Sequence, residues 1–214
     1  MHKPLLESAE DCLKAIGQLK LPSTLRFMQQ VAVALAACFV EGGKVILAGN
    51  GGSLCDASHF AEELTGVFRQ ERPALPAIVL SEAGHLTCVA NDLGFERVFS
   101  RGIEAHGRPG DLFIGLTTSG NSPNMVLAFQ EARARGLQTV AFLGKGGGKL
   151  QGVADFEWIV EEFLTSDRIQ ELHMAAIHLI IEQVESRLFY SRAPAYAESS
   201  SLSDLTLHVP TATL

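Results

Sequence analysis

The amino-acid sequence predicts an α/β protein with a doubly wound, five-stranded parallel sheet that is flanked by helices. Two observations support this prediction. Short, almost entirely apolar runs recur along the chain, as expected of strands that are buried on both faces. Between them lie longer segments with apolar residues at helical spacing, and this alternation is typical of a parallel sheet covered by helices on both sides.

The expected elements follow one another in a simple order. Two N-terminal helices, at residues 7–19 and 23–40, are separated by Pro22 and are expected to pack outside the sheet. The expected strands occupy five apolar runs, which are residues 44–48, 77–80, 112–116, 139–143 and 157–160. The other expected helices occupy five segments, which are residues 53–68, 85–91, 95–106, 124–135 and 168–189.

These elements predict one domain over residues 1–190. Residues 191–214 are rich in Ser, Ala, Pro and Thr, and this composition predicts a loosely ordered tail. The whole chain has 214 residues, of which 47% are hydrophobic and 19% are charged, so its composition is that of a globular protein with a sizeable core. The high apolar fraction also suggests buried surface between subunits.

Charge and cysteine content restrict the partners and the compartment. A net charge of −7 argues against nucleic acid, whose phosphates require clustered Lys and Arg. The apolar run at residues 31–40 is too short to span a membrane. The four cysteines form no CxxC pair and the N-terminus lacks the pattern of a signal peptide, so we expect a reducing cytoplasm.

Three expected strands end in loops rich in glycine or hydroxyl groups, at residues 49–53, 117–122 and 144–149. In an open parallel sheet the carboxyl ends of the strands form the ligand crevice, where helix N-termini offer free N–H groups to an anion. Residues 117–122 carry four hydroxyl groups and are the best candidate for a phosphate site. The same residue types also serve as ordinary cap and turn residues. No Walker or Rossmann pattern is present.

Two expected helices carry side chains suited to proton transfer or metal binding. His59 and Glu63 are four residues apart and share a helix face, and Gln170 and His178 lie along one row of the last helix, whereas His173 is rotated away. Such a set could bind zinc or act as a general acid–base pair. The simpler alternative is a surface His–Glu pair and a core histidine.

The order of these blocks resembles a known family. Gly49-Asn50-Gly51-Gly52-Ser53, followed by His59-Phe60-Ala61-Glu62-Glu63-Leu64, is similar to the sedoheptulose 7-phosphate isomerase (phosphoheptose isomerase) family of the sugar isomerase (SIS) domain superfamily. The segments at residues 89–92, 118–122 and 168–173 match it as well, and the likeness covers roughly residues 20–190.

The resemblance implies an isomerase that converts D-sedoheptulose 7-phosphate to D-glycero-D-manno-heptose 7-phosphate through a cis-enediol, toward the heptose of bacterial lipopolysaccharide or related glycans. It also implies a homotetramer with active sites between subunits and a bound zinc ion. By matched position, Glu63 is the expected base and His178 its acid–base partner. The expected metal ligands are His59, Glu63, Gln170 and His178. The expected substrate-binding residues are Asn50, Gly51, Gly52, Ser53, Asn91, Asp92, Thr117, Thr118, Ser119, Ser122, Asp167 and Gln170.

Two departures from the family pattern leave alternatives open. Val67 stands where many members have arginine, which could change substrate choice unless Arg69 substitutes, and the tail extends past the usual end. The alternatives are an isomerase of another sugar phosphate, or a non-catalytic SIS protein that binds a replication initiator or senses sugar phosphate. A pure binder would not need both Glu63 and His178, so the sequence favours the enzyme. The expected partners are a small sugar phosphate and further copies of this chain, with neither nucleic acid nor membrane.

Overall fold

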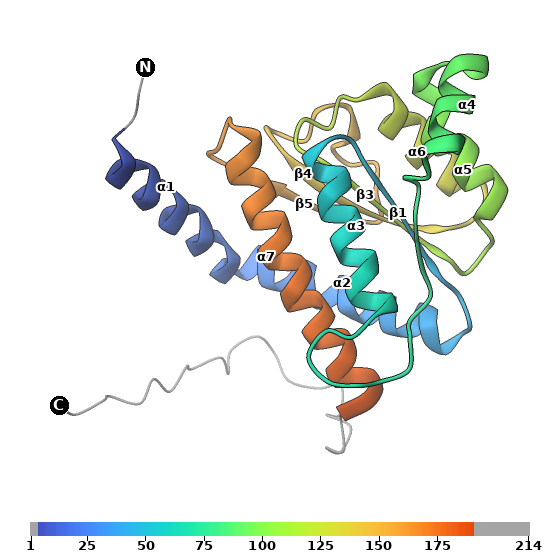
Figure 1. The fold of residues 1–214 in the computed structure, drawn as a ribbon. Helices are drawn as coiled ribbons and strands as arrows, with labels where there is room; N and C mark the ends of the chain where they lie inside the picture. Colours follow the sequence, from blue (N-terminus) through green and yellow to red (C-terminus); the bar gives the residue numbers. More distant parts are fainter. Residues whose placement is uncertain (1–3, 191–214) are drawn as a thin grey trace.

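The computed structural model describes residues 4–190, and a sheet of five parallel strands lies at its centre (Figure 1). The strand order is β2-β1-β3-β4-β5. This confirms the predicted architecture, and each strand matches its predicted apolar run to within one residue at either end. The strands are β1 (Val45–Gly49), β2 (Ala77–Val79), β3 (Leu112–Thr117), β4 (Gln138–Gly144) and β5 (Phe156–Val160).

The described residues form seven α-helices, namely α1 (Leu5–Gly17), α2 (Pro22–Val40), α3 (Gly52–Thr65), α4 (Ala83–Leu93), α5 (Val98–His106), α6 (Pro123–Ala134) and α7 (Ser166–Glu185). Short helical turns η1 (Gln18–Lys20), η2 (Phe95–Arg97), η3 (Gly148–Leu150) and η4 (Ser186–Tyr190) adjoin them. Helix α3 ends three residues earlier than predicted, because Gly66 leaves the helical conformation with a φ of −92° and a ψ of −134°, and the chain then turns away. The predicted tail lies outside the described residues.

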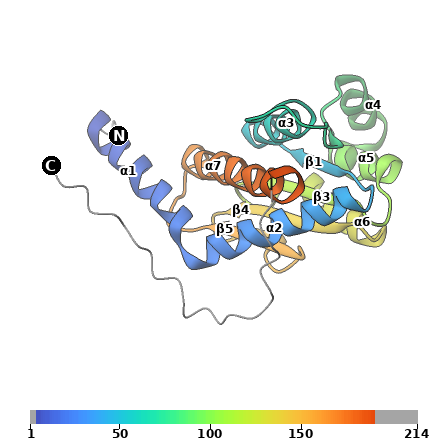
Figure 2. The same ribbon diagram turned by 90° about the horizontal axis from the view of Figure 1, so that it is seen from below.

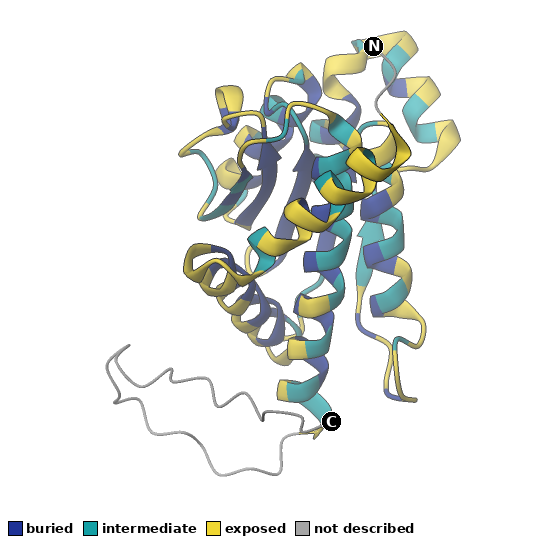
Figure 3. Cartoon of the chain, turned by 90° about the vertical axis from the view of Figure 1, so that its left-hand side faces the viewer, coloured by how far each residue is buried: buried dark blue, intermediate teal, exposed yellow. Residues whose placement is uncertain are grey.

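Alternate residues of the central strands point into two separate cores, one on each face of the sheet. In β1, Val45 and Leu47 belong to the core built with α2, α3 and α7, whereas Ile46 and Ala48 belong to the core built with α4, α5 and α6. Figure 3 shows the buried strands between helices with exposed outer faces. The sheet is therefore doubly wound, as predicted.

Helix α2 is part of the layer that covers the first face of the sheet. An 18-residue window of this 19-residue helix has a mean hydropathy of 1.4, so by length and composition alone α2 could cross a membrane, unlike the shorter run at residues 31–40. Half of this segment is buried, and the Phe27 ring packs edge-on against Phe142 at 5.2 Å and beside Trp158 at 5.9 Å. These contacts identify a core helix. Helix α1, by contrast, extends away from the sheet (Figure 2).

His173 of α7 is a core histidine beneath this layer. It is fully buried, its ring lies 5.5 Å from Phe142 and 5.8 Å from Trp158, and its Nε2 donates to the Leu143 carbonyl at 3.1 Å. Burial lowers the pKa of His173 to about 4, so the imidazole is neutral in the folded protein at physiological pH.

This neutral state predicts a pH-dependent contribution to stability. Between pH 6.5 and 4, His173 becomes protonated in the unfolded chain but stays neutral in the folded chain. The free energy of unfolding therefore falls as the pH is lowered. Relative to a His173→Leu variant, we expect the wild type to lose roughly 3 kcal/mol across this range. Urea titrations at a series of pH values measure it. Parallel pH profiles for the two proteins would contradict the assignment.

Candidate active site

The site begins where β1 and β3 lie side by side. The chain leaves β1 into α3 on one face and leaves β3 into α6 on the other, which opens a crevice at the carboxyl ends of the two strands. Asn50, after β1, and Asn124, in the first turn of α6, exchange two amide hydrogen bonds of 2.9 and 2.8 Å. This reciprocal pair joins the first two candidate phosphate loops.

Thr118, Ser119 and Ser122 of the second loop, residues 117–122, are half-buried. Ser122 occupies the N-cap position of α6, but its side chain makes no capping hydrogen bond, so capping does not explain this serine. The Thr118 hydroxyl lies 3.1 Å from the Ser166 hydroxyl, which also accepts a bond from the Lys145 ammonium at 3.1 Å. A cation thus lies beside the loop.

The third loop, residues 144–149, supports the second by close backbone packing. Gly120 has a φ of +62°, and a Cβ atom added there would lie 1.8 Å from the Gly147 carbonyl oxygen. A Cβ added to Gly148 would lie 2.4 Å from the Ser119 carbonyl oxygen. The side chain of Asn121 also accepts a bond from the Lys149 N–H at 3.1 Å. The two glycines are thus required for the loops to meet.

The predicted His/Glu cluster forms between α3 and α7, which lie side by side in Figure 1 (teal and orange). The Nε2 atom of His59 lies 2.9 Å from Nε2 of His178 and 3.4 Å from Oε1 of Glu63. One ligand atom from each of the three residues lies within 4.8 Å of the others. Imidazole nitrogens and a carboxylate oxygen are a donor set that zinc accepts, so the residues fit a divalent ion.

The surroundings of the cluster differ from one member to the next. The Glu63 side chain is 16% exposed, whereas that of Glu62 is 65% exposed and faces Nδ1 of His59 at 3.4 Å. A carboxylate in this place favours a proton on Nδ1 and leaves Nε2 of His59 free to act as a ligand. On the other side, the Phe68 ring lies 5.9 Å from the His178 ring. The cluster is therefore partly shielded from solvent.

Gln170 and Asp167 lie toward the first turns of α7. The Gln170 amide packs against the start of α3, where a Cβ added to Gly52 would lie 2.5 Å from Nε2 of Gln170. This position is two turns of α7 before His178. Hydrogen bonds from Thr165 and from the backbone at the helix start hold the pKa of Asp167 below its usual value, so Asp167 is a carboxylate at neutral pH.

The remaining predicted residues divide into two groups. Ser53 and Thr117 are buried at the base of the first two loops. Asn91 and Asp92 are exposed near the end of α4, on the other face of the sheet, and they hydrogen-bond to each other at 2.7 Å. The described contacts within this single chain do not bring Asn91 or Asp92 to the loops or to the cluster.

Three residues of this region were missed by sequence reasoning. Asn124 and Ser166 are ordinary helix-start residues by pattern, and only the fold brings them to Asn50 and Thr118. Asp56 lies one turn before His59, its Oδ2 atom is buried without a hydrogen-bond partner, and burial raises its pKa to about 6. No periodic or compositional signal in the sequence distinguishes these three residues.

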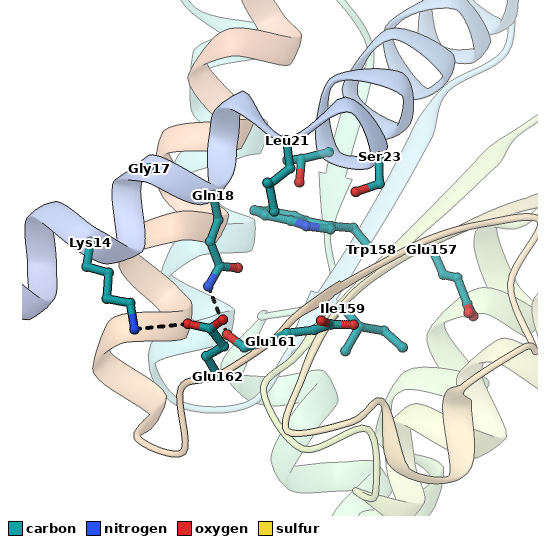
Figure 4. A pocket seen from close by; sticks show the side chains of 11 residues that line it. Lys14, Gly17, Gln18, Leu21, Ser23, Glu157, Trp158, Ile159, Glu161 and Glu162 are labelled. Carbon is teal, nitrogen blue, oxygen red and sulfur yellow. Dashed lines mark hydrogen bonds and ion pairs between the residues drawn. The ribbon is translucent and has the colours of Figure 1, made fainter.

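A cavity of about 450 Å³ lies away from this chemistry, between the N-terminal helices and β5 (Figure 4). Trp158, Leu21 and Gln18 line it, and the Gln18 amide donates to the Glu161 carbonyl at 2.9 Å. An ion pair of 3.1 Å between Lys14 and Glu162 crosses its edge. None of the predicted site residues lines this cavity, so it is separate from the His/Glu cluster and from the three loops.

The sheet order, the hydroxyl loop at the β1/β3 crevice and the partly shielded cluster define an SIS-domain protein. A family model described as the SIS domain matches residues 21–144. Phosphoheptose isomerase from Fusobacterium nucleatum is 58% identical over 161 residues, which are 75% of this chain and 82% of that protein. Phosphoheptose isomerase from Serratia proteamaculans is 50% identical over 88% of this chain and 96% of that protein.

Solved structures agree with the sequence relatives. The structure of a phosphoheptose isomerase from Francisella tularensis superposes with a TM-score of 0.77 at 33% identity, covering 85% of this chain and 94% of that one. The chain therefore belongs to the phosphoheptose isomerase family, a family of sugar-phosphate aldose–ketose isomerases.

The packing of Gly120 predicts that the phosphate loop is intolerant of a side chain there. Gly120→Ala places a methyl group against the Gly147 carbonyl and must displace residues 117–122. We expect affinity for a sugar phosphate, measured by calorimetry, to fall by at least about 1.5–3 kcal/mol, the value of one charge-assisted hydrogen bond. Gly146→Ala is the matched control, because Gly146 also has a positive φ, of +77°, but nothing lies within 4 Å of its added Cβ. Equal losses in both variants would contradict this account.

Proposed function

We propose that this chain isomerises D-sedoheptulose 7-phosphate to D-glycero-D-manno-heptose 7-phosphate. The observation that carries the proposal is the convergence of His59, Glu63 and His178 on the same helix pair whose first turns adjoin the phosphate loops. Glu63 follows Ser53 by ten residues, which is roughly 15 Å along α3. An elongated substrate anchored by its phosphate at one end would then present its other end to the cluster.

The proposed chemistry assigns one role to each group. The Glu63 carboxylate accepts the carbon-bound proton from one of the two reacting carbons, which gives the cis-enediol, and returns it to the other. His178 moves a proton between the two adjacent oxygens, and both acts are general acid–base catalysis. Ser53, Thr118, Ser119 and Ser122, with Lys145 nearby, hold the phosphate and so orient the reacting carbons. Asn50, Gly51 and Gly52 shape the first loop, and Asp167 is a candidate partner for sugar hydroxyl groups.

The cluster is also the proposed zinc site. His59, Glu63 and His178 would hold the ion, and Gln170 would have to turn from Gly52 to add an oxygen ligand. Bound zinc would supply Lewis-acid polarisation of the carbonyl and hydroxyl oxygens. Glu63 has two carboxylate oxygens, so metal binding by one leaves the other for the proton.

Two features bear on the choice between this reaction and the alternatives. A non-catalytic binder of sugar phosphate needs the loops but not a carboxylate held beside two imidazoles, and this favours the enzyme. Val67 is 59% exposed, and Arg69 forms an ion pair of 3.0 Å with Glu182 of α7, so Arg69 is engaged away from the phosphate loops. The missing arginine therefore keeps an isomerase of another sugar phosphate as the second candidate, which a panel of ketose phosphates distinguishes.

We further propose that the chain works as a cytoplasmic homotetramer. The apolar side chains of α1 that face solvent in the single chain, among them Leu5, Leu6 and Leu13, support self-association. Asn91 and Asp92, which do not reach the site of their own chain, would then contribute to the site of another copy. The product would supply heptose for lipopolysaccharide or a related glycan.

Replacing the proposed base tests the reaction directly. Glu63→Gln keeps the size of the side chain but cannot accept the proton, so we expect isomerisation to fall by at least about 10²–10⁴-fold while substrate still binds. His178→Gln should cause a comparable loss, because the two residues act as one unit. Incorporation of solvent deuterium at the reacting carbons, measured by NMR, reports the proton transfer.

Glu62→Gln is the matched control for Glu63→Gln. Glu62 has the same chemistry and adjoins Glu63, but its side chain is exposed, and the one contact described for that side chain is with Nδ1 of His59. We expect a much smaller loss. A Glu63→Gln protein that exchanged deuterium at the wild-type rate would falsify the base assignment and would favour the non-catalytic alternative.

Removal of the metal tests the proposed cofactor. We expect near-stoichiometric zinc in protein purified without chelator, loss of activity after chelation, and recovery on adding zinc back. Elemental analysis of His178→Ala provides a readout apart from activity, because the loss of one of three converging donors should lower the zinc content. Full activity after chelation, with no divalent ion present, would rule out the zinc site.

A further inference from the structure

A buried ion pair lies just beyond the His/Glu cluster. Arg72, in the loop of residues 66–76 that follows α3, directs its Nε toward Oε1 of Glu185, the last residue of α7, at 2.8 Å. The two side chains are 1% and 3% exposed. Every other ion pair recorded among the described residues has at least one partner more than 15% exposed. Burying two charges is costly, so this pair requires a specific use.

The guanidinium group of Arg72 also caps the end of α3. Its Nη2 donates to the Glu63 carbonyl at 2.7 Å, and its Nη1 donates to the Leu64 and Gly66 carbonyls at 2.7 and 3.1 Å. The last carbonyls of a helix have no partner within the helix, and a positive charge there is favourable to the helix dipole. Arg72 therefore fixes the backbone of Glu63 itself.

The same group binds both helices that make the cluster. Glu185 follows His178 by seven residues, about two turns of α7, so the two lie on one face. The guanidinium group of Arg72, which we call the Arg72 fork, thus connects the backbone carbonyl of Glu63 on α3 with the carboxylate of Glu185 on α7. The loop that carries Arg72 also brings Phe68 against the His178 ring. The spacing between Glu63 and His178 depends on how α3 and α7 are held together.

We propose that Arg72 and Glu185 are positioning residues that set the distance between Glu63 and His178. This inference deepens the proposed function and rests on its assignment of the cluster. It makes a specific prediction about kinetics, because the phosphate loops adjoin the opposite end of α3. Ser53 and Leu64 are eleven residues apart, roughly 16 Å along the helix. Loss of the fork should therefore affect turnover and metal binding far more than substrate affinity.

The test uses two conservative variants of the full chain, Arg72→Lys and Glu185→Gln. Lysine keeps the charge but cannot make the planar, multidentate contact of the guanidinium. We expect zinc affinity, measured by competition with a chromogenic chelator, and kcat each to fall about 10–100-fold, as for other residues that support metal ligands. KM should stay close to the wild-type value. The double variant should lose little more than either single variant, because both break one network.

Lys44→Met is the matched control for loss of stability alone. It breaks an ion pair of 2.5 Å between Lys44 and Asp111, which is partly buried at the amino ends of β1 and β3 and contacts neither α3 nor α7 among its described hydrogen bonds. We expect a lower melting temperature with unchanged zinc affinity and kcat. If Arg72→Lys and Glu185→Gln bound zinc and turned over as the wild type does, or if Lys44→Met lost both as well, the pair would have no positioning role.

Two variants and two measurements, zinc affinity and kcat, distinguish failure of this inference from failure of the proposed function. If Arg72→Lys failed to fold, Glu185→Gln alone would decide, since it keeps the hydrogen-bonded shape of the pair and removes one charge. If the wild-type chain lacked isomerase activity, the proposed function would fail, but zinc affinity would still reveal whether Arg72 and Glu185 position the cluster.

Discussion

Helices α3 and α7 come from distant parts of the chain, and only their contact brings the members of the cluster together. Each helix follows a strand of one parallel sheet and packs on the same face, so the two run in the same direction. Residues at similar distances from the two helix starts therefore meet. Gly52 lies beside Gln170 near the starts of α3 and α7, and His59 lies beside His178 about two turns farther along. The parallel sheet thereby imposes a line of paired positions, with phosphate loops at one end and the Arg72 fork at the other.

An anionic ligand on a chain of net charge −7 requires local compensation. In the proposed function, the loops would provide it mostly with neutral donors, which are hydroxyl groups and the N-termini of α3 and α6. Lys145 adds a single ammonium, placed by a backbone with a φ of +50° and hydrogen-bonded to Ser166. The overall charge of the protein therefore says little about the ligand, since the field near the crevice is set by a few oriented groups.

The features that the sequence could predict are those with a local signal. Strands buried on both faces give unbroken apolar runs, and these were predicted correctly. Loops that are rich in glycine and hydroxyl groups do follow these strands, and their role in binding an anion stays a prediction. The end of α3 was predicted wrongly, because Val67 and Phe68 continue an apolar pattern past Gly66, where the backbone leaves the helical conformation. Arg72 was also missed. It stands in the charged stretch of residues 69–72, which is typical of a solvated loop, and only tertiary packing buries it.

The two histidines of α7 show why residue type alone could not assign the site. His173 and His178 are five residues apart, which rotates them by roughly 140° about the helix axis. His173 faces the sheet, where burial keeps it neutral and its only hydrogen bond in the described structure is to a backbone carbonyl. His178 faces α3, half-buried beside a carboxylate and a second imidazole. One helix thus carries both a core histidine and a histidine placed where it could act as a ligand. A group that exchanges protons with a substrate must be reachable from the crevice, and the angle around α7 determines which histidine meets that condition.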